Sequence, residues 1–134
     1  VSGGTKNYGL KSNAPLMATA FIGTKIGRLN ITGSTYKIDF SQNNIFFIYA
    51  SSAYNVTLPD ESQVASMYGM SSLPSDFGLM LVFRCLAGSK NVTLAGIYDQ
   101  NGSVQSYTLA VGDSIILLVA KVPYFGYFLI NYTS

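Results

Sequence analysis

The 134-residue sequence contains no histidine and no tryptophan, and it has only one cysteine. Without histidine or paired thiols, only oxygen ligands remain for a metal ion, and no run of alternating acids resembles a calcium loop. A single cysteine also excludes an intrachain disulfide, so we expect Cys85 to be a small buried core residue. The sequence therefore predicts neither a metal site nor a bound cofactor.

Charge is also scarce, since charged residues make up 10% of the chain and the net charge is +2. The eight basic residues are scattered, whereas nucleic-acid binding requires a clustered basic patch. No spacing of acids proposes a general base in a cleft, because Asp60 fits a helix cap and Asp113 fits a turn. We therefore expect a protein that binds no nucleic acid and is not an enzyme.

Long apolar runs are missing as well. No segment approaches the roughly 18 apolar residues that indicate a membrane-spanning helix, so no transmembrane segment is expected. Residues 1–15 mix Gly, Ser, Asn and Lys without periodicity, which favours an arm or linker from an upstream stalk. Residues 16–134 are long enough to form a single domain with its own core.

Short apolar segments are what the chain has in abundance, with hydrophobic residues at 49% and aromatic residues at 13%. Turn residues recur at intervals of roughly ten, which is typical of an all-β sandwich or barrel. One short helix is predicted after Asp60, with Gln63 as its capping-box partner and Gly69 at its exit. The expected strands, about ten in number, cover residues 16–22, 26–31, 36–40, 45–49, 54–58, 79–86, 92–98, 104–109, 115–120 and 127–132.

These strands fall into two groups. Residues 36–40, 54–58 and 103–108 are apolar on one parity only, as expected when one face is wet. Residues 45–49, 79–86, 115–120 and 127–132 are apolar on both parities, which predicts a sheet whose outer face is covered by other copies of the chain. We expect the subunit contact to include the aromatic residues Tyr49, Tyr124, Phe125, Tyr127 and Phe128.

The C-terminal 26 residues carry a family resemblance. The stretch Leu109-Ala110-Val111-Gly112-Asp113, an apolar strand, and Tyr124-Phe125-Gly126 before a terminal strand resemble the ending of the tumour-necrosis-factor and complement globular-head superfamily. This resemblance implies a ten-strand jelly-roll β-sandwich that forms a tight homotrimer around a threefold axis. The chain departs from that pattern in its short link between the last two strands and in lacking Trp, a disulfide and an acidic calcium cluster.

The Ser/Asn/Thr/Tyr-rich, charge-poor composition, with the segments NVTLP and LAVGDS, is similar to the terminal knobs of bacteriophage tail needles and tail fibres. That resemblance implies a trimeric knob at the virion tail tip that contacts a host cell-surface receptor or glycan during attachment or penetration. Two alternatives stay open. One is a secreted ligand or pattern-recognition domain of the tumour-necrosis-factor or complement-head type, and the other is a purely structural virion jelly roll.

Arg84 is the one charge in an otherwise apolar strand. A guanidinium on a covered apolar face requires a carboxylate or carbonyl partner. The simpler interpretation is a salt bridge within or between subunits. The alternative is that Arg84 of adjacent subunits binds a small anionic ligand near the threefold axis.

Tyrosine and asparagine in predicted loops suit carbohydrate recognition, because an aromatic face packs against sugar C–H groups and amides bond hydroxyls. The candidates are Tyr54, Tyr68, Tyr98 and Asn101. A core or interface role is the simpler interpretation for each tyrosine.

Overall fold

The computed structural model describes residues 26–31 and 38–134, which form eight strands and one short helix. The described residues are therefore mostly β with one short helix, as the pattern of short apolar segments predicts. The elements in chain order are β1 (Ile26–Ile31), β2 (Ile45–Ala50), β3 (Tyr54–Val56), α1 (Glu61–Met67), β4 (Gly78–Cys85), β5 (Val92–Tyr98), β6 (Val104–Leu109), β7 (Ser114–Ala120) and β8 (Gly126–Thr133).

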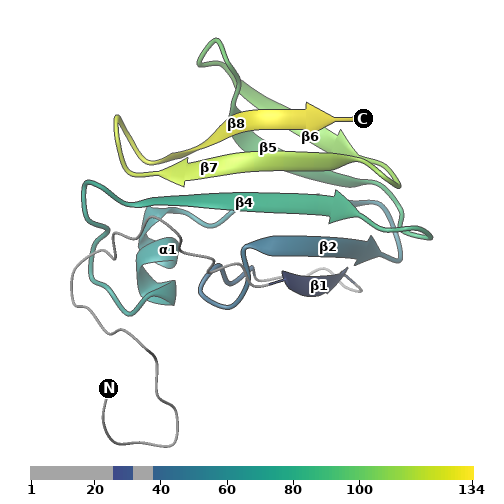
Figure 1. Ribbon diagram of the computed structural model, residues 1–134, viewed down its shortest axis with the longest axis horizontal. Helices are drawn as coiled ribbons and strands as arrows, with labels where there is room; N and C mark the ends of the chain where they lie inside the picture. Colours follow the sequence, from purple (N-terminus) through teal and green to yellow (C-terminus); the bar gives the residue numbers. More distant parts are fainter. Residues whose placement is uncertain (1–25, 32–37) are drawn as a thin grey trace, which may run out of the picture.

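All eight described strands belong to one sheet, in the order β1-β2-β4-β7-β8-β5-β3, with β6 paired to β5 (Figure 1). Three pairings are antiparallel, namely β4 with β7, β7 with β8, and β5 with β6. The other four are parallel, joining β1 to β2, β2 to β4, β3 to β5, and β5 to β8. The expected antiparallel contact between the last two strands is confirmed.

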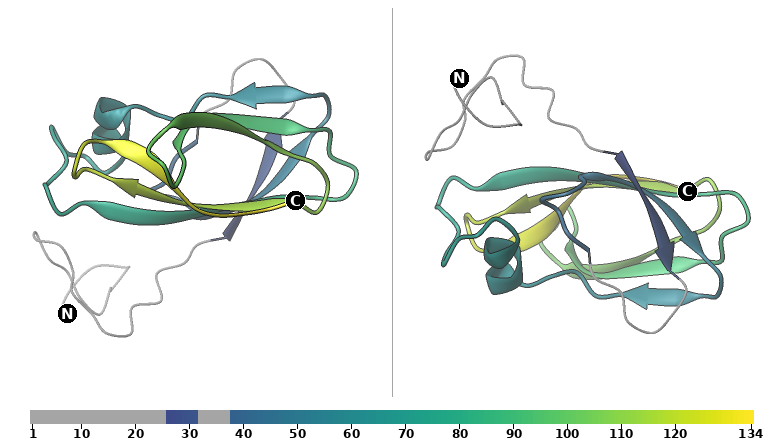
Figure 2. Two further views of the ribbon diagram at one scale, coloured as in Figure 1. Left: turned by 90° about the horizontal axis from the view of Figure 1, so that it is seen from above. Right: turned by 90° about the horizontal axis from the view of Figure 1, so that it is seen from below.

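The sheet curls around the core, so that β4 and β7 run along one side of the molecule and β3 and β5 along the opposite side (Figure 2). In β2, β4 and β7 one parity points inward and is buried. Phe46 and Phe83 stack there with ring centres 5.1 Å apart. The largest fully buried side chains include Phe46, Phe83, Ile48, Leu81, Leu94, Ile97, Leu109, Ile115, Leu117 and Val119.

Helix α1 begins as its sequence predicts. The Asp60 carboxylate accepts the Gln63 backbone N–H at 2.8 Å, and the Gln63 side-chain oxygen accepts the Asp60 backbone N–H at 2.8 Å. This reciprocal pair is a capping box, which satisfies two backbone donors that the first helical turn leaves unbonded. Val64 and Ala65 anchor the helix against the core, so the helix fixes the path of the chain after Pro59.

The turn before β7 also matches its prediction. The Asp113 carboxylate accepts the Ala110 backbone N–H at 2.9 Å, and the Gly112 N–H donates to the Cys85 carbonyl at 2.9 Å. Cys85 is buried, as expected of a core residue. The turn therefore ties the start of β7 to the end of β4.

Four expectations need correction or lie outside the described residues. Residues 38–40, expected in a strand over 36–40, form no strand, because Asp39 begins a turn in which its carboxylate accepts both the N–H and the hydroxyl of Ser41. The strand expected over 54–58 ends at Val56. The arm over residues 1–15, the strand over 16–22 and residues 36–37 lie outside the described part of the chain.

The parallel pairings differ from the arrangement that the family resemblance implies, since a jelly roll is built from antiparallel strands. Strand β2 lies between β1 and β4 and is parallel to both. Strand β5 is parallel to both β3 and β8. Within the described residues the fold is therefore a curled mixed sheet.

Candidate functional site

Side chains of paired residues on neighbouring strands lie on the same side of a sheet, so the strand register defines the outer face of the molecule. We use "outer face" for three rows of paired residues that cross the curled sheet. The first row is apolar throughout, and its end members Val104 and Met80 are 59% and 50% exposed. From β6 to β4 it contains Val104, Tyr98, Phe128, Leu118 and Met80.

The second row continues this apolar surface toward β1. Its β1 member, Ile26, is exposed, and the three central members are half-buried. From β8 to β1 it contains Asn131, Ile116, Val82, Ile45 and Ile26. Apart from Asn131 at the end of the second row, the two adjacent rows are apolar, and their partial exposure within one chain leaves an apolar surface for a partner to cover.

The third row is different because it carries two arginines. From β8 to β1 it contains Thr133, Ser114, Arg84, Phe47 and Arg28, so Phe47 lies between the two guanidinium-bearing residues. Arg28 donates from Nε to the Asn30 side-chain oxygen at 3.0 Å, and its guanidinium lies 5.5 Å from the centre of the Tyr49 ring. The outer face therefore changes from apolar to cationic across the sheet.

Arg84 lies on the outer face with Met80 and Val82, as its parity predicts. It is exposed, and among the described residues the one ion pair joins Lys121 to Glu61. Arg84 thus has no acidic partner within the described part of its own chain. Of the two salt bridges considered from the sequence, the intrachain one is not formed there.

An aromatic cluster joins the first row to the link between β7 and β8. Tyr98 stacks on Phe128 with ring centres 5.3 Å apart, and Tyr124 contacts both rings at 5.2 and 5.8 Å. Tyr124 comes from the link between β7 and β8 and remains 48% exposed. A close approach is possible here because residue 126 is glycine, whose added Cβ would lie 2.8 Å from the Tyr98 ring.

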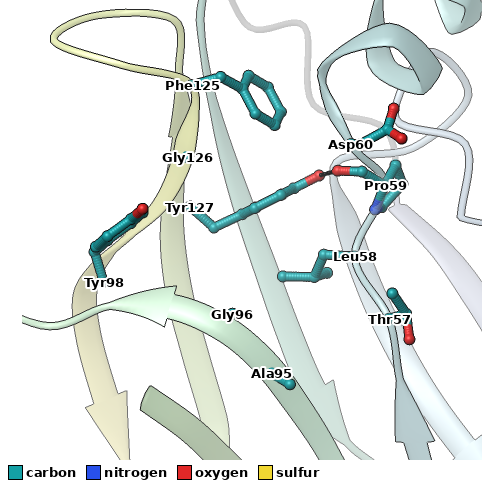
Figure 3. Close-up of a pocket in the computed structure, with 10 residues that line it drawn as sticks. All are labelled: Thr57, Leu58, Pro59, Asp60, Ala95, Gly96, Tyr98, Phe125, Gly126 and Tyr127. Carbon is teal, nitrogen blue, oxygen red and sulfur yellow. Dashed lines mark hydrogen bonds between the residues drawn. The ribbon is translucent and has the colours of Figure 1, made fainter. Parts of the chain in front are cut away.

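A second feature, the edge pocket, arises because two strands share one edge of β5. Strand β6 pairs with both halves of β5, so β3 and β8 must divide the opposite edge. Strand β3 pairs with Val92 to Leu94 and β8 with Ile97 and Tyr98, which leaves Ala95 and Gly96 unpaired at a bulge. The edge pocket at this gap has a volume of about 370 Å³ (Figure 3). It is lined by Thr57, Leu58, Pro59, Asp60, Ala95, Gly96, Tyr98, Phe125, Gly126 and Tyr127.

Tyr127 closes the inner side of the edge pocket. Its side chain crosses toward the segment before α1, where its hydroxyl donates to the Pro59 carbonyl at 2.6 Å (Figure 3). Burial, and to a smaller extent the nearby Asp60 charge, raises the pKa of Tyr127 well above its usual range. The hydroxyl is therefore a neutral structural donor that joins β8 to the start of the helix.

Asp60 lies at the rim of the edge pocket, at the start of α1. The Gln63 backbone N–H and the Ser62 hydroxyl, each 2.8 Å from the same carboxylate oxygen, lower the pKa of Asp60. The carboxylate is thus charged at neutral pH. Nearby, Lys121 in the β7–β8 link pairs with Glu61, which ties this link to the helix.

No family model, curated protein or solved structure matches this chain. Function is therefore inferred from the outer face and the edge pocket. The described residues contain no group of three or more side chains suited to hold a metal ion. Helix α1, the one helix in that part of the chain, is not long and apolar enough to cross a membrane.

The residues considered for ligand binding do not form one site. Tyr98 lines the edge pocket and belongs to the outer face. Tyr68 is half-buried at the end of α1, where its hydroxyl donates to the Phe40 carbonyl, and Tyr54 packs against the core at the start of β3. Asn101 is exposed in the β5–β6 turn, where its backbone N–H donates to Asp99.

The five aromatic residues expected at the subunit contact also separate. Tyr49 and Phe128 point to the outer side, and Tyr124 is exposed beside it. Phe125 instead lines the edge pocket and packs against the core, and Tyr127 is only 5% exposed. Within one chain, Phe125 thus forms part of the pocket wall and Tyr127 is buried.

The edge pocket was missed from the sequence because its walls come from three separated segments. Gly96 was the one indication of the bulge that the sequence offered, since glycine inside a strand pattern often marks a bulge. In the structure its backbone φ is +78°. Which strands would flank that bulge depends on the parallel pairings of β3 and β8. No local pattern predicts those pairings.

Proposed function

We propose that this domain is a non-enzymatic homotrimeric knob at the tip of a bacteriophage tail needle or fibre, where it contacts the host cell envelope outside the cell. The observation that supports the trimer is the outer face, with two adjacent apolar rows left partly exposed in one chain. Resemblance of the sequence to phage knobs supports the location. The proposal includes about ten strands in the whole chain but does not require the antiparallel order of a jelly roll.

A cyclic trimer accounts for the outer face in physical terms. Exposed apolar patches of this extent are uncommon on monomeric proteins, because removing apolar area from water is favourable by roughly 25 cal/mol per Å². Threefold symmetry lets every subunit bury the same patch. The apolar first and second rows would lie within the contact, and the cationic third row would lie toward its border.

The structural roles of three acids support the non-enzymatic part of the proposal. Asp60 caps α1, Asp99 accepts backbone N–H groups of Asn101 and Ser103, and Asp113 closes the turn before β7. Each of these carboxylates already has a structural role at the surface. Binding of an envelope component requires no reacting group.

The outer-face contact is tested with two methionines of similar exposure. Met80 in the first row is 50% exposed, and Met70 after α1 is 43% exposed and lies away from that row. We expect Met80→Lys to convert the trimer into monomers, because three lysines would be buried in an apolar contact. Met70→Lys, the matched control, should leave the trimer intact.

Multi-angle light scattering after gel filtration gives the mass, and circular dichroism checks that both variants remain folded. Equal masses for the two variants would remove the outer face from the proposed contact.

The location at the tail tip is tested separately, by deleting residues 16–134 in the virion. Adsorption and DNA ejection should both fall, and unchanged infection would contradict this part.

The proposal extends to a small anionic ligand near Arg84 at the subunit contact. Arg28 and Arg84 flank Phe47, so two guanidinium groups of each subunit lie near one aromatic side chain. A carboxylate would bind such groups through charged hydrogen bonds. Soaking crystals with small carboxylates should place density within hydrogen-bonding distance of Arg84, and its repeated absence would end this extension.

A further inference from the structure

We propose that the edge pocket binds the pyranose ring of a neutral sugar. This inference deepens the proposed function, and rests on it in naming a glycan as the envelope component. The pocket itself is formed by a single chain, at the gap between β3 and β8 along one edge of β5.

The size of the edge pocket suits one or two sugar rings. Its volume of about 370 Å³ lies at the small end of the range for ligand sites, which is roughly 300–1,000 Å³. Gly96 adds to this space, because a Cβ built there would meet no atom within 4 Å. The capping box of α1 and the Lys121–Glu61 ion pair hold the two sides of the pocket in place.

The walls supply the apolar surface that a sugar ring needs. Tyr98 and Phe125 bring aromatic rings from β5 and from the residue before β8, and Leu58 adds an aliphatic side chain from the segment after β3 (Figure 3). Packing of Tyr98 on Phe128 and of Phe125 on Tyr127 limits the motion of both rings. Rigid aromatic side chains give contact area at low cost in conformational entropy.

Polar groups for the sugar hydroxyls come from three places. The backbone of Ala95 and Gly96 is exposed at the bulge, and no residue of β3 or β8 lies opposite it. Asp60 has further acceptor capacity, because its two identified bonds use one carboxylate oxygen and a carboxylate has about four lone-pair sites. Thr57 adds a hydroxyl at the exposed side.

This combination disfavours three other ligand classes. An anion would meet the Asp60 charge and no lysine or arginine among the lining residues. A purely apolar ligand would cover the Asp60 carboxylate without giving it a hydrogen bond, which is costly. A quaternary ammonium would suit the carboxylate and the rings, but it could form no hydrogen bond with the Thr57 hydroxyl or with the exposed backbone at Ala95 and Gly96. A neutral sugar satisfies all of these groups.

The test uses the full chain, labelled with nitrogen-15, and a panel of methyl glycosides of glucose, galactose, mannose and N-acetylglucosamine. We expect at least one glycoside to shift the amide resonances of Ala95, Gly96 and Gly126 in a saturable way. N-acetylneuraminic acid and choline serve as the anionic and cationic probes. No response to any of the four glycosides, or a response of these amides to choline or N-acetylneuraminic acid alone, would overturn the proposal.

Two variants with the same change in side chain locate the site. Ala95 is exposed and lines the pocket, so Ala95→Leu should fill the space and reduce the affinity for the responding glycoside at least tenfold. Ala53→Leu is an exposed control just before β3 and outside the pocket, and it should bind as the unmodified chain does. Equal binding by both variants would overturn the assignment to this pocket.

The outcome is separable from that of the proposed function. Sugar binding by a chain that sedimentation shows to be a monomer would support the pocket and contradict the trimer. A trimer in which the amides of the pocket respond to no glycoside would do the reverse. Binding that is lost in Ala95→Leu and retained in Met80→Lys would place the sugar site in the single chain.

Discussion

At the scale of the residue, Tyr127 shows how one side chain joins distant segments. Its ring is almost fully buried, and its hydroxyl donates to the carbonyl of Pro59, 68 positions earlier in the chain. The bond connects β8 to the start of α1 and forms the inner side of the edge pocket. Removing the hydroxyl leaves a buried carbonyl without this partner.

Tyr127→Phe should therefore lower the free energy of unfolding by about 1–2 kcal/mol, because the ring stays in place and one buried hydrogen bond is lost. Urea denaturation followed by circular dichroism gives the value. Tyr132→Phe is a matched control, since its hydroxyl also donates to a carbonyl at 2.6 Å but lies at the exposed surface. An equal loss in both variants would contradict a special role for the buried bond.

The same tyrosine predicts a dependence on alkaline pH. Burial raises the pKa of Tyr127 above its ordinary value of 10.0, so the native state keeps this proton after the unfolded chain has lost it. The contribution to stability is therefore fully present below pH 10 and is lost as the pH rises above it, at up to about 1.4 kcal/mol per pH unit.

Urea midpoints measured across this alkaline range check the prediction. Tyr127→Phe should flatten the decline without removing it, because burial also raises the pKa of Tyr68. If the unmodified protein and the variant declined with the same slope, the buried phenol would not be the group responsible.

At the scale of the element, the paired ends of β4, β7 and β8 place Gly78, Ala120 and Gly126 in one row. The two glycines meet different surroundings. A Cβ at Gly126 would lie 2.8 Å from the Tyr98 ring, whereas a Cβ at Gly78 would meet only Leu118 at 3.9 Å. The aromatic cluster can therefore form only where β8 begins with glycine.

Gly126→Ala should destabilise the protein by about 1–3 kcal/mol, because the added methyl group displaces Tyr98 and Phe128. Gly78→Ala, the matched control, should be neutral or stabilising by up to about 1 kcal/mol, since it only restricts the unfolded chain. Urea denaturation measures both, and near-ultraviolet circular dichroism reports on the tyrosine cluster. A similar small effect in both variants would show that the rings do not depend on this close approach.

The elements that depend on local chemistry were predictable from the sequence. The Asp60–Gln63 capping box and the Gly112-Asp113 turn each use side chains within a few residues of the backbone groups they bond. Strands β2, β4, β5, β7 and β8 follow from runs of apolar residues. The expected strand over 36–40 failed in its described part because Asp39 bonds to Ser41 and favours a turn over continued alternation.

Long-range pairing was not predictable in this way. That β2 would be parallel to both β1 and β4, or that β3 and β8 would share one edge of β5, depends on connections that cross the molecule. For the same reason the sequence did not show that Phe125 lines the edge pocket or that Tyr127 is buried in the core.

At the scale of the whole molecule, the outer face connects the fold to the proposed assembly. The inner parity of β2, β4 and β7 is buried within one chain, and the outer parity of the same strands, apart from Arg84 and Ser114, is apolar but only partly covered. A single chain therefore buries only the inner of the two faces of these strands. The proposed trimer would bury the outer parity, and Tyr98, which also lines the edge pocket, would lie where the contact and the pocket meet.

Sedimentation equilibrium of the unmodified chain at micromolar concentration tests this central claim most directly. A trimer predicts a single species with three times the chain mass of 14.4 kDa, and no monomer on dilution through that range. A stable species with the mass of one chain would contradict the trimer and leave the apolar rows of the outer face without an occupant.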